Sequence, residues 1–424
     1  MLQNLKTGML ALAVLAAGAM SAGPATAQDK QQDKQPIKIG FGMSQTGPLG
    51  PNGKSALLAM EIWVEETNAK GGLLGRPVQL VNYDDQSNPS TVPGIYTKLL
   101  DVDKVDVIVG GYGTNMIAPA MPIAMQRKKA FMALYGLGVN DDFKYDRYFA
   151  MIPSGPEPKT SFTKGFFDTA MAQNPKPATV AIVAADAEFS KNASDGAREN
   201  AKKHGLKIVY DKSYPPSTTD FAPIVRAIQA TNADLVVICS YPLDSVGMVL
   251  AANEAKLNPK MIGGAMVGLQ STVFKTKLGP ALNGYMNYDF WLPAQSMMFD
   301  GTDAFLKKYQ ERAAKAGVDP LGYYMAPFSY AYLDILGQAI TASKGTDDAK
   351  LVEVLRKTTF KTIVGDIKFA PNGEWAKSRV FQAQFRGIKG NGVDQFKDPA
   401  TLAIITPAEY KSGDVIYPFE KARQ

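Results

Sequence analysis

The feature that most restricts the fold is a regular alternation of β-branched runs with helical runs. The first strand-like runs span residues 37–41, 78–83, 105–111, 130–134 and 147–152. Helical patterns lie between them. In the first of these, Leu57, Met60 and Val64 share one face before Gly71 and Gly72 end the helix. Strands that alternate with helices predict parallel βαβ units.

The alternation begins again after a stretch rich in proline and glycine at residues 152–160. The next strand-like runs span 179–185, 207–214, 234–240 and 260–266, with helical patterns at 161–172, 191–204, 221–231 and 245–257. Two more helices are expected at 302–317 and 324–344, and the tail 363–424 contains short strands and loops. The sequence therefore predicts an α/β fold with two doubly wound parallel sheets.

The N-terminal segment has the pattern of a secretory signal. Lys6 is the only charged residue before residue 28, an apolar run extends from Met9 to Met20, and Ala25-Thr26-Ala27 has the form of a cleavage site. The apolar run is too short to span a bilayer. We expect residues 1–27 to be removed as a signal peptide and residues 28–35 to form a flexible leader.

The remaining residues, about 397, are enough for two domains. The composition, with 46% hydrophobic and 20% charged residues, is that of a soluble globular protein. The net charge of +6 comes from basic residues scattered among acidic ones, with the densest run at 127–129. Nucleic-acid binding is not expected, because it requires basic residues that cluster.

The chain has one cysteine and one histidine, and this limits the chemistry that it can perform. Cys239 is the only cysteine, and its apolar strand context predicts a small buried hydrophobe rather than a nucleophile. His204, the only histidine, is expected at a helix end and has no partner for a metal site or a catalytic triad. We therefore expect no metal and no cofactor.

The stretch "GFGMSQTGPLGPNGKSALLAMEIW", residues 40–63, contains Gly53-Lys54-Ser55, the end of a phosphate-binding signature. That signature needs a glycine five residues before Gly53, where this chain has Pro48. Proline has no amide hydrogen to offer a phosphate. The nucleotide interpretation is therefore disfavoured.

Ligands of doubly wound sheets bind just outside the carboxyl ends of the strands. The loops that follow the predicted strands span residues 44–50, 111–115, 134–138, 186–190, 240–244 and 265–268. They carry glycines, hydroxyls and aromatic residues, and no nucleophile–base or metal-binding motif. An enzyme is therefore disfavoured, and a binding protein is favoured.

At this point the chain resembles the periplasmic solute-binding proteins of branched-chain-amino-acid-type ABC transporters. The resemblance runs from about Ile37 to Glu374. It rests on "SQTGPLGPNGKSALLAMEIWVEETNAKGGLLGRPVQLVNYDDQSNP", "VDVIVGGYGTNMIAPAMPIA", "FMALYGLG" and "TFKTIVGDIKFAPNGEW". It implies a type I periplasmic binding protein, located in the periplasm, that closes on a small solute and delivers it to the permease subunits. We expect a monomer.

The resemblance also implies two lobes joined by a three-segment hinge. The N-terminal lobe is expected to comprise residues 36–151 and 291–362, and the C-terminal lobe residues 154–287 and 366–424. The hinge is expected near residues 152–154, 288–290 and 363–366.

The family's site can be carried over position by position. Its serine loop aligns with Gly113, Thr114 and Asn115, and Gly138 replaces the hydroxyl of its threonine loop. Its two tyrosines align with Phe189 and Tyr241. The disulfide of many relatives is absent, because Ser87 and Gly113 stand at its positions. The expected ligand-binding residues are Ser44, Tyr112, Gly113, Thr114, Asn115, Tyr135, Gly136, Gly138, Phe189, Tyr241, Ala265, Met266 and Tyr288.

One departure from the family bears directly on the ligand. The glutamate that receives the ammonium group of an amino acid is replaced by Ala265, and no acid occurs from Met261 to Phe274. An unpaired ammonium in a dry cleft costs several kcal/mol. Aromatic residues gather at the loop positions instead, with Trp291 near the hinge. We therefore predict an aromatic or apolar carboxylate, such as a benzoate- or cinnamate-like acid. The alternatives are a hydrophobic amino acid and a ligand-sensing receptor domain.

Overall fold

The computed structural model describes residues 35–423. The expected signal peptide and nearly all of the expected leader lie outside these residues. Within them, no helix combines the length and apolar character required to cross a membrane.

The first lobe is built on a parallel sheet of β1 (Ile37–Met43), β2 (Val78–Asp84), β3 (Val107–Tyr112), β4 (Phe131–Tyr135) and β5 (Tyr148–Ala150). Their order is β2-β1-β3-β4-β5. The strand order reverses between β1 and β3, which is where doubly wound sheets open a crevice for ligands. The predicted strand positions and the parallel pairing are confirmed here.

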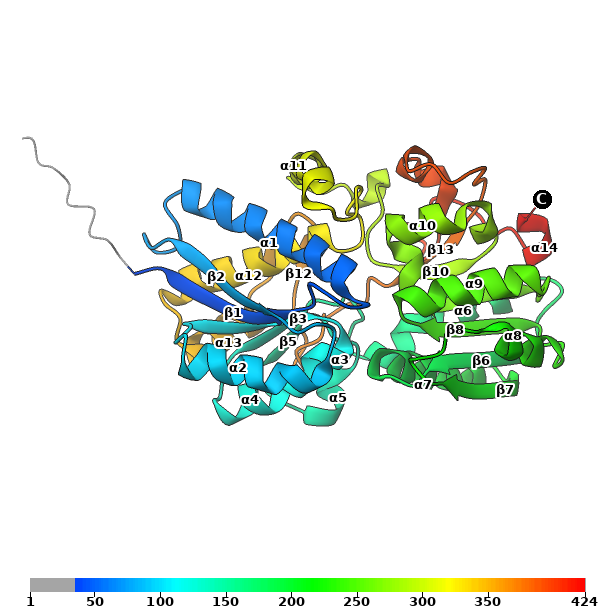
Figure 1. Cartoon of the computed structure of the whole chain (residues 1–424), viewed down its shortest axis with the longest axis horizontal. Helices are drawn as coiled ribbons and strands as arrows, with labels where there is room; N and C mark the ends of the chain where they lie inside the picture. The colour runs from blue at the N-terminus through cyan, green and yellow to red at the C-terminus, as the bar shows by residue number, and fades with distance from the viewer. Residues whose placement is uncertain (1–34, 424) are drawn as a thin grey trace, which may run out of the picture. The chain divides into compact units, whose positions relative to one another are not determined.

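Helices from two distant parts of the chain cover this sheet (Figure 1). The early helices are α1 (Gly50–Ala69), α2 (Val92–Asp101), α3 (Thr114–Ile117), α4 (Met121–Gln126) and α5 (Val139–Phe143). The later ones are α11 (Thr302–Ala316), α12 (Ala326–Ser343) and α13 (Asp348–Lys357). Helix α12 is fixed to the sheet by Tyr332, whose buried hydroxyl lies 2.7 Å from the carbonyl oxygens of both Gly110 and Met132.

Helix α1 also explains why the phosphate-loop motif is not a loop. The helix begins at Gly50, so Gly53-Lys54-Ser55 lies inside it. A Cβ at Gly53 would lie 1.8 Å from the Ser44 carbonyl oxygen, so the glycine serves close packing of the helix on β1.

The second lobe is built on a seven-stranded sheet. Its parallel part contains β6 (Thr179–Ala185), β7 (Lys207–Tyr214), β8 (Leu235–Ser240), β9 (Met261–Met266) and β10 (Met286–Asp289). Two antiparallel strands from the tail, β13 (Phe381–Phe385) and β14 (Leu402–Thr406), extend it beyond β10 in the order β14-β13-β10-β9-β8-β6-β7. The parallel part of the second sheet is as predicted, and the two tail strands make the whole sheet mixed.

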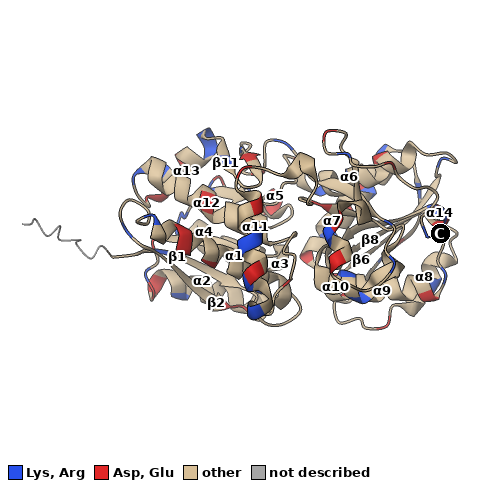
Figure 2. Cartoon of the chain, turned by 90° about the horizontal axis from the view of Figure 1, so that it is seen from above, with Lys and Arg blue, Asp and Glu red and all other residues tan. Residues whose placement is uncertain are grey.

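The helices of this lobe are α6 (Pro158–Met171), α7 (Glu188–Lys203), α8 (Ala222–Gln229), α9 (Pro242–Glu254), α10 (Thr272–Leu278) and the short α14 (Phe419–Ala422). Strand β8 is buried along its whole length, as expected for a central parallel strand. Cys239 lies in it, and burial raises the pKa of its thiol to about 12. The prediction of a buried cysteine is thus confirmed. Lys and Arg are interspersed with Asp and Glu around both lobes (Figure 2).

The chain passes between the two sheets in three places. The first passage lies between β5 and α6, and the second follows Asp289 at the end of β10. Before the third, the hairpin of β11 (Phe360–Thr362) and β12 (Gly365–Ile367) leads to Gly373, whose carbonyl oxygen accepts from the Ala150 amide at 2.8 Å. Residues up to Trp375 therefore remain with the first lobe. We propose that the third hinge segment is residues 376–380, later than the expected 363–366.

Candidate functional site

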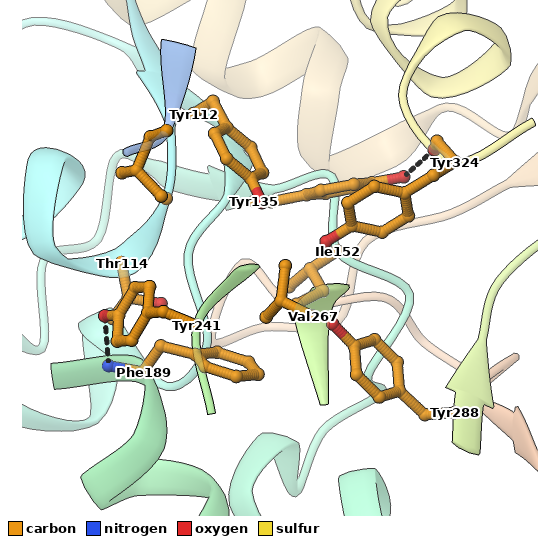
Figure 3. A pocket seen from close by; sticks show the side chains of 11 residues that line it. Tyr112, Thr114, Tyr135, Ile152, Phe189, Tyr241, Val267, Tyr288 and Tyr324 are labelled. Carbon is orange, nitrogen blue, oxygen red and sulfur yellow. Dashed lines mark hydrogen bonds between the residues drawn. The ribbon is translucent and has the colours of Figure 1, made fainter. Parts of the chain in front are cut away.

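The ends of the strands from both lobes meet around one small cavity with a volume of about 20 Å³ (Figure 3). Tyr112 and Tyr135 are the last residues of β3 and β4, and Tyr241 and Val267 directly follow β8 and β9. The residues that line the cavity are Leu49, Tyr112, Gly113, Thr114, Tyr135, Ile152, Phe189, Tyr241, Val267, Tyr288 and Tyr324. The cavity thus lies where the fold is expected to bind a ligand.

Aromatic rings form most of the wall. Tyr135 and Tyr324 have ring centroids 5.3 Å apart, and the rings of Phe189 and Tyr241 meet edge to face at 5.8 Å. Tyr288 packs 6.4 Å from Phe189. Rings that contact one another in this way hold flat apolar surfaces in fixed orientations, which suits a flat apolar ligand.

The hydroxyl groups of the wall fall into two kinds. The Tyr135 hydroxyl donates to the Tyr324 carbonyl oxygen at 3.2 Å, so its proton is not available to a ligand. The hydroxyl oxygens of Tyr112, Thr114 and Tyr241 instead accept hydrogen bonds. The donors are the Asn52 side chain at 2.9 Å, the Leu137 amide at 3.0 Å and the Phe189 amide at 3.1 Å. These three hydroxyls retain a proton that they can donate to a bound molecule.

Tyr288 is a special case among the wall tyrosines. Its hydroxyl is buried and forms no hydrogen bond of good geometry within the described chain, although the Tyr324 hydroxyl lies close enough to influence its pKa. Figure 3 shows this hydroxyl turned towards the centre of the cavity. A buried polar group without a partner is costly, so this position favours a ligand that supplies one.

The wall carries no formal charge. No Asp, Glu, Lys, Arg or His is among the lining residues of this cavity. Burial raises the pKa of Tyr112 to about 12 and moves those of Tyr135, Tyr241, Tyr288 and Tyr324 still further above the ordinary value of 10. All five tyrosines therefore keep their hydroxyl protons near neutral pH.

Two buried charges lie just behind the wall. The Arg379 guanidinium is 5.9 Å from the ring of Phe328, which is itself 5.7 Å from the ring of Tyr135. On the other side, burial raises the pKa of Asp289 to about 6, against the influence of nearby Lys275. Asp289 follows Tyr288 on β10, and neighbouring residues of a strand point to opposite faces.

The structure brings together only part of the predicted site. Lining residues among those predicted are Tyr112, Gly113, Thr114, Tyr135, Phe189, Tyr241 and Tyr288. Ser44 is not one of them, since its hydroxyl donates to Asp85 at 2.5 Å below the edge of the first sheet. Ala265 and Met266 are fully buried within β9, and Val267 faces the cavity in their place.

Three other predicted residues also lie outside the lining. Gly136 packs among Ile117, Val139 and Tyr148. Gly138 has a positive φ of 63° and lies against Lys159 of the second lobe. The side-chain oxygen of Asn115 is buried without a hydrogen-bond partner, next to the lining residue Gly113, but Asn115 itself does not line the cavity. Trp291 is core, with its ring against Tyr323 and its indole N–H donating to the Met297 carbonyl oxygen.

Sequence reasoning did not single out four lining residues. Leu49, Ile152 and Val267 lie in segments that were expected at the strand ends or the hinge. Tyr324 comes from the connection between α11 and α12, far along the chain, where the pattern predicted only the start of a helix. Nothing local in the sequence signals that this tyrosine reaches the cavity.

Comparison with known proteins identifies the class. The model of the periplasmic binding protein family matches residues 36–391. The chain belongs to that family. It is of the branched-chain amino acid type, so the family predicted from the sequence is confirmed. Among curated relatives, the Leu/Ile/Val-binding protein homolog 7 of Brucella abortus is 25% identical over 407 residues, covering 93% of this chain and 98% of the relative.

Two solved structures of this periplasmic binding protein fold are informative. The LivJ substrate-binding protein of Streptococcus pneumoniae, in complex with isoleucine, has a TM-score of 0.70 and 19% identity, covering 91% of this chain and 100% of that one. A solute-binding protein of an ABC transporter from R. palustris, in complex with 4-hydroxybenzoate, has a TM-score of 0.72 and 19% identity, covering 90% and 98%. At this identity they show the shared fold.

Proposed function

We propose that this periplasmic binding protein carries a small aromatic or apolar carboxylate to the permease of an ABC importer, as a monomer exported through its N-terminal signal. The observation that carries the ligand class is the wall of the interlobe cavity, which combines aromatic rings with hydroxyl donors and has no acidic side chain. Such a wall favours a ring and an oxygen-rich group and offers no anionic partner to a cation.

The missing acid argues against an α-amino acid. An ammonium group that enters a dry cavity loses its hydration, and it is stable there only with an anionic partner. Val267 faces the cavity after β9, and it offers no charge. Two acids directly neighbour lining residues along the chain. Asp289 points to the opposite side of β10 from Tyr288, and Glu188, which precedes Phe189, is exposed.

A carboxylate has partners at the same wall. The hydroxyls of Thr114, Tyr241 and Tyr112 accept from fixed N–H groups, so their protons are free to point to an anion. Hydrogen bonds to a charged acceptor are stronger than bonds between neutral groups. Arg379, behind Phe328, adds a positive potential from a region of low dielectric.

The relatives do not decide between ligand classes, since one solved relative holds isoleucine and another 4-hydroxybenzoate. The cavity wall of this chain favours an aromatic acid such as 4-hydroxybenzoate over an amino acid. The runner-up ligand, a hydrophobic amino acid, requires an ammonium partner that the lining residues do not provide.

The test begins with native mass spectrometry of protein purified without refolding, which identifies any solute that co-purifies. Isothermal titration with benzoate, 4-hydroxybenzoate, cinnamate, leucine, isoleucine and valine follows. We expect at least one aromatic acid to bind at micromolar or better Kd and to be recovered unchanged. Binding of leucine, isoleucine or valine without binding of any aromatic acid would overturn the ligand class. Recovery of an altered compound would indicate an enzyme.

A further inference from the structure

Beyond the cavity wall, one buried side chain joins the two lobes directly. Asn192, on helix α7 of the second lobe, donates from Nδ2 to the Leu137 carbonyl oxygen of the first lobe at 2.8 Å. Asn192 is 6% exposed and Leu137 is fully buried. A carbonyl oxygen can only accept, so the orientation of the Asn192 amide is fixed by this contact.

Leu137 also contacts a residue that lines the cavity. Its amide donates to the Thr114 hydroxyl oxygen at 3.0 Å, and Thr114 lines the cavity from the first lobe. Asn192 and Thr114 therefore hold opposite ends of the same residue. Helix α7 also carries Phe189, a lining residue of the second lobe.

The loop around Leu137 is shaped for close approach of the second lobe. The next residue, Gly138, has a φ of 63°, a conformation that favours glycine. A Cβ there would lie 3.1 Å from the side chain of Lys159, on helix α6 of the second lobe. Glycine at this position therefore lets the loop come within reach of Asn192.

We propose that Asn192 is a positioning residue for solute binding. It holds Leu137 when the lobes are together and, through Leu137, directs the Thr114 hydroxyl proton into the cavity. This inference rests on the proposed function in one respect, that the cavity is the solute site. Because Asn192 does not line the cavity, it acts on every solute by favouring the arrangement in which the lobes are in contact.

The chain offers a matched control on the same helix. Asn200 is also buried, and its Nδ2 donates to the Thr160 carbonyl oxygen at 2.8 Å and lies 3.1 Å from the Thr163 hydroxyl. Both partners belong to α6, within the second lobe. Asn200→Ala therefore removes a buried asparagine of similar setting without affecting a contact between lobes.

The experiment uses the full mature chain with spin labels at Lys307→Cys on α11 and Arg226→Cys on α8, both exposed sites. Pulsed electron paramagnetic resonance measures the interlobe distance in the parent, Asn192→Ala, Asn192→Asp and Asn200→Ala, each with and without 4-hydroxybenzoate. Stopped-flow fluorescence measures the dissociation rate of 4-hydroxybenzoate in unlabelled protein.

We expect both Asn192 variants to change the interlobe distance distribution and to raise the dissociation rate at least fivefold. Asn192→Asp should have the larger effect, because it places a carboxylate against a carbonyl oxygen. Asn200→Ala should lower the Tm and leave both readouts unchanged. Unchanged distances in both Asn192 variants, or an equal change in Asn200→Ala, would overturn the inference. If 4-hydroxybenzoate does not bind the parent protein, the proposed ligand fails, and the distances without solute still decide the role of Asn192.

Discussion

The Phe189 backbone amide donates a hydrogen bond to the Tyr241 hydroxyl oxygen at 3.1 Å, and the rings of the two residues meet edge to face at 76°. Phe189 is the second residue of helix α7 and Tyr241 directly precedes helix α9, so the bond joins the beginnings of two helices at the cavity. Because the amide occupies the hydroxyl oxygen, the Tyr241 proton remains for another acceptor. This relationship makes Tyr241 a donor of fixed direction.

Tyr241→Phe should therefore weaken binding of 4-hydroxybenzoate while retaining the aromatic wall. A hydrogen bond to a charged acceptor contributes about 1.5–3 kcal/mol, so we expect Kd to rise by at least tenfold. Isothermal titration measures this. Tyr214→Phe is the control, since that buried hydroxyl of the same lobe donates to Asp244 at 2.6 Å and does not line the cavity. A Kd that rises in Tyr214→Phe and not in Tyr241→Phe would contradict the assignment.

Tyr288→Phe should have opposite effects on stability and on binding. The Tyr288 hydroxyl is buried and forms no hydrogen bond of good geometry within the described chain, and such a group costs about 1–3 kcal/mol. Its removal should raise the free energy of unfolding without solute by about 1 kcal/mol, measured by chemical denaturation. Affinity for 4-hydroxybenzoate should fall, because the solute loses a donor.

The control for this change is Tyr332→Phe. That hydroxyl lies 2.7 Å from two carbonyl oxygens in the first lobe, so its loss should lower stability and leave Kd unchanged. If Tyr288→Phe destabilises the protein as Tyr332→Phe does, the Tyr288 hydroxyl has a structural partner, and its role towards the solute must be rejected.

The sequence predicted the repeating strand–helix units well, because the apolar pattern of each strand or helix is visible within a short stretch of the chain. The predicted limits of the strands at 179–185 and 207–214 are those of β6 and β7. The tail strands β13 and β14 complete the second sheet by antiparallel pairing with β10. No periodicity along the chain encodes which edge a distant strand joins. Helix α13 was not predicted at all.

Sequence reasoning named those residues of the cavity lining that strand ends supply, and it did not name those that distant segments supply. Tyr112 and Tyr135 end adjacent strands that pair in register, so both reach the same edge of the sheet. Val267 was passed over in favour of Ala265 and Met266 because the resemblance aligned the family's glutamate with Ala265. The side-chain direction of residues at the end of β9 depends on where the strand stops, a detail that the sequence did not show.

Val267→Glu tests the role of charge in the cavity at the position that faces it. A carboxylate there should repel a bound carboxylate and raise the Kd for 4-hydroxybenzoate by at least tenfold more than the neutral Val267→Gln does. It should also create weak leucine binding, by giving an ammonium group a partner. Titration calorimetry at pH 7 measures both solutes. Equal affinities in the two variants would show that charge at this position does not select the ligand.

We expect Glu374, near the hinge, to make the free energy of unfolding depend on pH. Its carboxyl is buried, accepts from the Ser154 hydroxyl at 3.2 Å through one oxygen and leaves the other oxygen without a partner. Burial raises the pKa of Glu374 well above its ordinary value of 4.5, and Asp141 raises it further. The folded protein therefore holds a proton at Glu374 that the unfolded chain releases, in the pH range from about 4.5 up to the raised pKa.

In that range the Glu374 carboxyl makes the free energy of unfolding fall as pH rises, by up to about 1.4 kcal/mol per pH unit. Glu374→Gln keeps the shape and cannot ionise. Its stability relative to the parent should therefore be nearly pH-independent below pH 4.5 and should increase from there towards pH 7. Urea denaturation at a series of pH values measures the difference. Glu353→Gln, at an exposed site, should show no such increase. A difference between Glu374→Gln and the parent that stays constant from pH 4 to pH 7 would mean that Glu374 is not protonated in the folded protein.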